Sequence, residues 1–212
     1  MLSIKKLFTA FLDLKPDMNF VDTFEISIPL PLRELYEIKE LYNQTKPNNQ
    51  LFDTQDSLTN ISKIDFSSNF FIFLLENQGN WICQTELGND NPKVIYDDRC
   101  GEREVISDNL ANFLTTYALQ ELTFVLDNIS YLHWTEQTIR EMFVDVKALW
   151  INKNYIYPNS NYSYYLLDNE VIFMNASSTS FFATNNIEKF NLIEEKINSR
   201  QHSIVASGGG RK

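Results

Sequence analysis

The chain is poor in the residues that most often mark a catalytic or metal-binding protein. Its 212 residues include only two cysteines, two histidines, six glycines and six prolines. Cys83 and Cys100 are too few for a disulfide framework, so we expect two half-buried free thiols in a reducing compartment. The sequence has no phosphate loop, glycine-rich dinucleotide turn, paired CxxC or HExxH. These absences disfavour an enzyme, and we predict no catalytic residue, no cofactor and no metal site.

The chain is also short of positive charge and of long apolar runs. Lysine and arginine number 18 against 28 aspartates and glutamates, which gives a net charge of −10. Nucleic-acid binding requires a basic face, so we expect no nucleic-acid partner. No apolar run approaches the roughly 18 residues that span a membrane. The apolar stretch at residues 1–12 is interrupted, whereas a signal peptide has a continuous apolar segment. We therefore expect a cytoplasmic protein whose acidity serves either a basic partner or solubility alone.

The residues that are abundant favour a packed core. Hydrophobic residues make up 43% of the chain and aromatic residues 14%, which is typical of a globular protein. We predict an α+β fold with one domain over residues 1–200, in which helices flank a mixed or antiparallel sheet. Residues 201–212 end in a glycine-rich run and are expected to form a flexible tail.

Apolar periodicity predicts five helices. The first is stopped near Pro16, and the second begins at Pro31, because proline suits the first turn of a helix. Ser107 and Thr135 are expected N-caps for two later helices. The expected helical ranges are 7–14, 31–42, 107–122, 135–143 and 187–197, and residues 45–50 are expected to form a loop.

Strands are predicted through the middle and the C-terminal half of the chain. Residues 68–75 form a continuous apolar run, the pattern of a strand buried on both faces. Gly79 is expected to have a positive φ in the turn that follows, and Asp168-Asn169 is expected to join two later strands. The other expected strands span residues 81–87, 93–96, 147–157, 162–167, 171–175 and 180–184.

Three features allow both a functional and a structural interpretation. His133 is either the base of a nucleophile or a partly buried residue beside Trp134, and the sequence favours the second. Residues 88–91 form either part of a cation loop or a plain polar turn, and a plain turn is favoured. The tyrosines form either a binding surface or ordinary strand packing, with packing again favoured; they are Tyr155, Tyr157, Tyr162, Tyr164 and Tyr165.

The order of four motifs carries more information than any one of them. A proline-led helix, residues 31–36, precedes a strand that runs into Glu76-Asn77-Gln78-Gly79 and the aromatic Trp81. A turn with Pro92 and a serine-initiated helix with Phe113 follow. Over about residues 25–125 this order resembles the SUKH superfamily, which includes cell-wall-assembly-regulator-like proteins and many bacterial immunity proteins. The residues of this chain that match are Pro31, Tyr36, Glu76, Asn77, Gln78, Gly79, Pro92 and Phe113; residues 126–200 form a strand-rich continuation without a match.

The resemblance implies an α+β fold and a non-enzymatic binding role. Many members of this family bind and neutralise a cognate polymorphic toxin, often a nuclease or a deaminase. Others are housekeeping regulatory or adaptor modules, and the sequence leaves both roles open. If the partner is a nuclease toxin, it carries a basic groove for phosphates, so we expect an acidic binding face opposite it. That expected face has Trp81 nearby as an apolar anchor and includes some of Glu86, Asp90, Asp97, Asp98, Glu102 and Glu104.

Overall fold

Helices and antiparallel strands account for most of the residues placed by the computed structural model, which describes residues 3–14, 28–46, 51–156, 161–176 and 179–208. The helices of this part are α1 (Ile4–Leu12), α2 (Leu30–Thr45), α3 (Leu110–Val125), α4 (Glu136–Met142), α5 (Ile187–Gly208) and the short 3-10 helix η1 (Ile61–Lys63). Its strands are β1 (Asp56–Leu58), β2 (Phe70–Glu76), β3 (Ile82–Glu86), β4 (Val94–Asp97), β5 (Arg103–Ser107), β6 (Asn128–Leu132), β7 (Lys147–Asn154), β8 (Asn161–Leu167), β9 (Val171–Ala176) and β10 (Thr179–Thr184).

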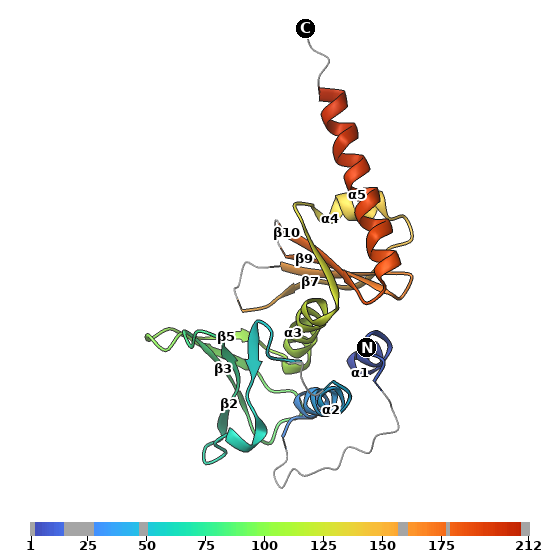
Figure 1. Cartoon of the computed structure of the whole chain (residues 1–212). Helices are drawn as coiled ribbons and strands as arrows, with labels where there is room; N and C mark the ends of the chain where they lie inside the picture. Colours follow the sequence, from blue (N-terminus) through green and yellow to red (C-terminus); the bar gives the residue numbers. More distant parts are fainter. Residues whose placement is uncertain (1–2, 15–27, 47–50, 157–160, 177–178, 209–212) are drawn as a thin grey trace.

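The strands form two antiparallel sheets with α3 between them (Figure 1). The first sheet is a meander in the order β1-β2-β3-β4-β5, and the second has the order β6-β10-β9-β8-β7. Helix α3 packs against β5 of the first sheet and against β7, β9 and β10 of the second. The predicted α+β single-domain fold is confirmed. The expected single sheet is divided because α3 interrupts the run of strands after β5.

Helix α3 belongs to both halves of the molecule because it is buried on opposite sides. Toward the first sheet, the Phe113 ring meets the Phe73 ring of β2 edge-on at 6.0 Å. Toward the second sheet, the Tyr164 hydroxyl donates to the Thr116 carbonyl oxygen at 3.2 Å. A helix that is apolar around most of its surface packs inside a protein rather than on its outside. The largely apolar surface of α3 therefore explains why this helix lies between the two sheets.

The strand that is buried on both faces is β9, not β2. In β9, Ile172 and Met174 join the core around α3, while Phe173 joins a second apolar cluster under α4 and α5. In β2, Phe70 is 37% exposed and Ile72 is only half-buried. The prediction for residues 68–75 is therefore wrong in this respect. A short apolar run gives no indication of which face a helix will later cover.

Side-chain caps set the starts of several helices. Ser3 caps α1, and Pro31 lies in the first turn of α2 as predicted. Thr135 caps α4, since its Oγ1 accepts a hydrogen bond from Thr138 N at 3.3 Å. The prediction of Ser107 as a cap is wrong: Asn109 Oδ1 accepts from Asn112 N at 2.8 Å. Ser107 is instead the last residue of β5.

Other differences concern short or polar elements. The sequence did not predict β1, β5 or β6, whose residues alternate too weakly between apolar and polar to stand out. Helix α5 continues to Gly208, past the expected end at residue 197 and into the expected tail, and its C-terminal part extends away from both sheets (Figure 1). Pro16, Tyr157 and residues 47–50 and 209–212 lie outside the described residues.

Candidate binding groove

The Glu76–Gly79 motif closes the turn between β2 and β3. Gly79 has φ +77°, which confirms the predicted positive value. Glu76 Oε2 accepts hydrogen bonds from Asn80 N at 2.9 Å and Asn80 Nδ2 at 3.1 Å. Asn77 Oδ1 accepts from Ser57 Oγ at 3.0 Å, which ties this turn to β1. These side chains therefore build the hairpin and hold it against its neighbour.

The remaining motif residues attach helices to the first sheet. The Tyr36 hydroxyl of α2 donates to the Thr59 carbonyl oxygen at 2.6 Å. Leu110 N donates to the Pro92 carbonyl oxygen at 2.9 Å, which fixes the start of α3 beside β4. Gln78 is exposed in the turn. Apart from Gln78 and Pro31, the matching residues thus have structural contacts.

Two of the expected partner-binding aspartates stabilise the β4–β5 turn. Asp97 Oδ1 accepts from Arg99 N at 2.8 Å. Asp98 Oδ1 accepts from three backbone N–H groups between residues 100 and 102, at 2.8 to 2.9 Å. These bonds, above all the one from Cys100, lower the pKa of Asp98. Both carboxylates have a local structural role.

The expected acidic face does not form one surface. Asp90 precedes β4, whereas Asp98 and Glu102 follow it, so they lie at opposite ends of that strand. Glu104 pairs with Tyr96 and Arg103 pairs with Asp97, and adjacent strand positions point to opposite faces. Glu86 is half-buried at the end of β3, and Glu102 and Glu104 are exposed.

Trp81 is not a surface anchor. Its side chain is 6% exposed and belongs to the main core, and its ring centroid lies 5.9 Å from that of Tyr96. Aromatic-led strands often bury the aromatic residue. The expectation of an exposed Trp81 is therefore wrong, and any apolar anchor point must lie elsewhere.

A groove of about 390 Å³ lies where α1, α2 and α3 meet the β3–β4 turn and β7. This volume falls within the range of sites that take a small molecule or a partner side chain. Of the expected partner-binding residues, the groove includes Asp90. Its lining consists of Ile4, Leu30, Pro31, Glu34, Leu35, Asp90, Asn91, Ala111, Asn112, Leu114, Thr115 and Trp150.

The groove combines buried apolar residues with exposed acids. Leu35 and Leu114 are buried in the core, whereas Glu34 and Asp90 are exposed. Leu30 is 58% exposed and lies one helical turn before Glu34 on α2. An occupant would therefore meet apolar surface and two carboxylates at once.

Local hydrogen bonds hold the walls of the groove in place. Asn91 Oδ1 accepts from Ala111 N at 3.0 Å, so the β3–β4 turn is docked on the first turn of α3. Trp150 Nε1 donates to Thr116 Oγ1 at 3.0 Å, which orients the indole beside α3. The sequence did not predict Glu34 or Trp150 as site residues. The sequence signal was limited to a leucine and a glutamate four residues apart at positions 30 and 34, and Trp150 had none.

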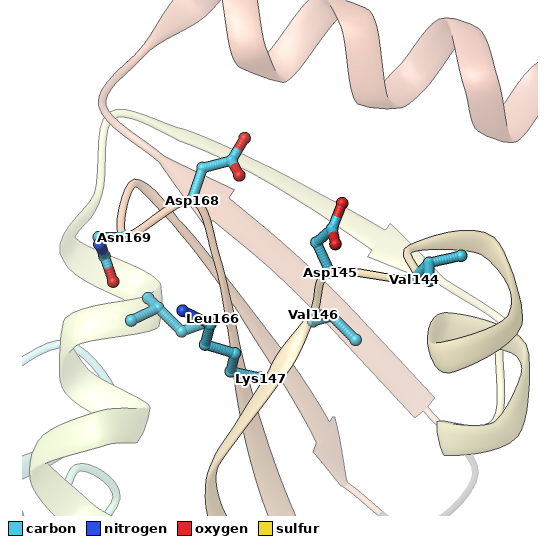
Figure 2. Close-up of a pocket in the computed structure, with 7 residues that line it drawn as sticks. All are labelled: Val144, Asp145, Val146, Lys147, Leu166, Asp168 and Asn169. Carbon is cyan, nitrogen blue, oxygen red and sulfur yellow. The ribbon is translucent and has the colours of Figure 1, made fainter.

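A second hollow of about 400 Å³ lies at the end of the second sheet. In Figure 2 the Asp145 and Asp168 side chains point in the same direction, on the side where the α5 ribbon runs. Asp168 already forms an ion pair with Lys189 Nζ at 2.5 Å. This hollow is lined mainly by turn residues. Its lining is Val144, Asp145, Val146, Lys147, Leu166, Asp168 and Asn169.

Two buried carboxylates lie between α3 and the first sheet. Glu121 accepts hydrogen bonds from Thr54 N at 3.1 Å, Thr54 Oγ1 at 2.8 Å and Gln55 N at 3.2 Å. Asp56 Oδ2 accepts from the Tyr155 hydroxyl at 2.8 Å. Burial raises the pKa of Glu121 to about 7 and that of Asp56 to about 6. Neither residue lines the groove or the second hollow, so their measurable effect is on stability.

The histidine, tyrosine and cysteine candidates from the sequence differ in their burial. His133 is exposed beside the Tyr131 ring, 4.8 Å between centroids, and so is not the partly buried residue that was expected. Tyr155, Tyr164 and Tyr165 are buried, which favours the packing interpretation. Both thiols are free; they are not half-buried as expected, because Cys83 is buried and Cys100 is exposed.

Three further findings concern metal-binding clusters, membrane-spanning helices and similarity to known proteins. Among the described residues, no three of histidine, cysteine, aspartate and glutamate gather closely enough to hold a metal ion. No helix in that same part of the chain combines the length and apolar character needed to cross a membrane. No family model, curated protein or solved structure matches the chain.

Proposed function

We propose that this chain is a non-enzymatic cytoplasmic protein that neutralises a basic protein toxin by stoichiometric binding. The role is that of the immunity proteins of the SUKH superfamily, which residues 25–125 resemble. The observation that supports a binding role is the groove between α2 and α3, where apolar side chains lie beside Glu34 and Asp90. A toxin of nuclease type supplies the complementary charge, since it must bind phosphates.

The groove has the properties of an anchor site in a protein interface. Binding energy concentrates in a few side chains that fill desolvated pockets, with polar groups around them. Here Leu30, Pro31 and Trp150 supply accessible apolar surface, and the carboxylates select for positive charge. The net charge of −10 adds long-range attraction to a basic partner and speeds the encounter at low salt.

A housekeeping adaptor of the same fold is the second candidate. It would use the same groove, because an exposed anchor point suits either role. The two roles differ in what happens to the partner. An immunity protein abolishes the partner's activity in a one-to-one complex, whereas an adaptor binds the partner and leaves its activity intact.

The test is to produce the chain together with the basic C-terminal domain encoded by a neighbouring gene. We expect rescue of growth, a one-to-one complex by light scattering and loss of the domain's activity in vitro. Leu30→Arg should abolish all three, because it places a positive charge in the groove, four residues before Glu34, where it pairs with that carboxylate and repels a basic partner. The matched control is Leu192→Arg on α5, where the leucine is 64% exposed and lies outside the groove.

Each outcome decides between the candidates. A complex in which the domain remains active would replace immunity by the adaptor role. If Leu30→Arg rescues growth as well as wild type does, the groove is not the binding site. Arginine is among the better helix formers, so Leu30→Arg should not unfold α2, and circular dichroism of the variant checks this.

A further inference from the structure

We infer that the groove binds an arginine side chain of the partner, with its guanidinium between Glu34 and Asp90 and its methylene stem on the apolar floor. This inference rests on the proposed function, and it names the residue type that the groove selects. The three features that carry it are two free carboxylates, the apolar floor and the aromatic wall.

The two carboxylates are free to bind a cation. Among the described residues, neither Glu34 nor Asp90 has an ion-pair or hydrogen-bond partner for its carboxylate. The basic side chain closest in sequence to Asp90, Lys93, lies 3.7 Å from Asp108 Oδ1 instead. Glu34 comes from α2 and Asp90 from the β3–β4 turn, so the two acids face the groove from separate elements.

This arrangement suits arginine better than lysine. The guanidinium presents five N–H donors in a planar fork and can bond two carboxylates at once, whereas an ammonium is a compact point charge. The side-chain oxygen of Asn112, on the first turn of α3, supplies a further acceptor in the same lining.

The rest of the lining suits the arginine stem and plane. Three methylenes can lie against Leu30 and Pro31 while the charged head stays near solvent. Trp150 forms an aromatic wall, and Lys153 Nζ lies 4.9 Å from its ring centroid, so an incoming guanidinium competes with that ammonium for the indole. Guanidinium groups stack on indole rings more often than ammonium groups do.

The test uses small probes and the whole chain, so it does not need the partner. Nα-acetyl-arginine methylamide is titrated into ¹⁵N-labelled protein and followed by NMR. We expect saturable shifts of the Asn91, Ala111 and Asn112 amides and of the Trp150 indole N–H. The lysine analogue should bind at least about threefold more weakly, and the citrulline analogue, which has the same shape without the charge, should cause no saturable shift.

Paired variants test the two acids. Glu34→Gln with Asp90→Asn should raise the dissociation constant for the arginine probe by about three- to tenfold, the size expected for exposed ion pairs. Glu40→Gln with Asp127→Asn removes the same charge from exposed positions outside the groove and should leave the constant unchanged.

The results separate this inference from the proposed function. Citrulline binding as tightly as arginine, or no shift at the groove, overturns the arginine site even if the toxin complex forms through Leu30. Arginine binding that depends on Glu34 and Asp90, combined with a toxin complex insensitive to Leu30→Arg, supports the arginine site and removes the proposed function. Equal loss in the control pair would show that net charge, rather than the groove, attracts the probe.

Discussion

The two sheets differ in how completely they are covered. The second sheet has α3 on one face and α4 with α5 on the other, and its central strand β9 is buried on both. The first sheet has its core on one face only, and Phe70 and Val105 remain 37% and 50% exposed on the other. An antiparallel sheet tolerates one open face, which is why both arrangements occur in one fold.

The two halves also differ in what they bury. Both carboxylates that are buried among the described residues, Asp56 and Glu121, lie between α3 and the first sheet. The second half buries polar side chains as well: Asn175 Nδ2 donates to Ser180 Oγ at 2.8 Å, and Ser180 Oγ donates to the Trp134 carbonyl oxygen at 2.7 Å. The first half therefore buries two carboxyl groups, whereas the polar side chains buried in the described part of the second half are uncharged.

The largest expected effect on stability comes from replacing one phenylalanine by alanine in each of the two sheets. Phe173→Ala in β9 removes a ring that packs on Phe143 and Phe182. It should lower the free energy of unfolding by about 3–5 kcal/mol. Phe70→Ala, on the open face of β2, should cost about 1 kcal/mol because much of its ring is already in water. Urea denaturation measures both, and equal losses would contradict the difference in coverage.

A pH effect should follow from the buried carboxylates. The pKa of Glu121 is raised from an ordinary 4.5 to about 7, so between these values the folded state holds a proton that the unfolded state has released. Stability should therefore fall as pH rises from 5 to 8, by about 3 kcal/mol for Glu121. Asp56, raised to about 6, acts in the same direction.

Substitution of Glu121 should show how much of the pH dependence of stability comes from each of the two carboxyl groups. Glu121→Gln should remove the part of the pH-dependent change in unfolding free energy that comes from Glu121 and leave the part that comes from Asp56. Urea denaturation at pH 5 and pH 8 measures both. Glu40→Gln, an exposed position on α2, serves as the control and should keep the full dependence. A wild-type protein equally stable at both pH values would show that neither carboxyl binds a proton in the folded state near neutrality.

A smaller effect is expected at the turn of the first sheet. Gly79→Ala should destabilise the protein by about 1–2 kcal/mol, because φ +77° places a Cβ in an unfavourable left-handed conformation. The added Cβ would meet only Arg99 Nη1 at 3.7 Å, so backbone strain rather than a clash is the cause. Thermal unfolding measures the loss. An unchanged melting temperature would contradict it.

The smallest effect has the opposite sign and lies in the second sheet. The β8–β9 turn has two non-glycine residues with positive φ, Asp168 at +53° and Asn169 at +60°. Asn169→Gly should stabilise the protein by about 0.5 kcal/mol because glycine adopts this conformation without steric cost. Asp168 should not be changed in this test, since it pairs with Lys189. Chemical denaturation of Asn169→Gly and of Gly79→Ala under the same conditions compares the two turns directly.

The sequence predicted the local elements more reliably than their environment. The turn at Gly79, the helix cap at Thr135 and the strands from β7 to β10 follow from short-range patterns, and the structure confirms them. The site was predicted less well. Asp90 lines the groove, but Trp81 is buried and Asp97 and Asp98 hold their own turn. An acidic residue in a turn looks the same in sequence whether it binds a partner or its own backbone.

The sequence by itself determined the fold class, the acidity and most of the turns, because periodicity, charge and backbone preference act over a few residues. Only the tertiary structure decided that α3 divides the strands into two sheets and that β9, not β2, is covered on both faces. It alone brought Glu34, Asp90 and Trp150 together, from positions far apart in the chain. Such proximity depends on the packing of α2, β7 and the β3–β4 turn around α3, and one sequence has no local signal for it.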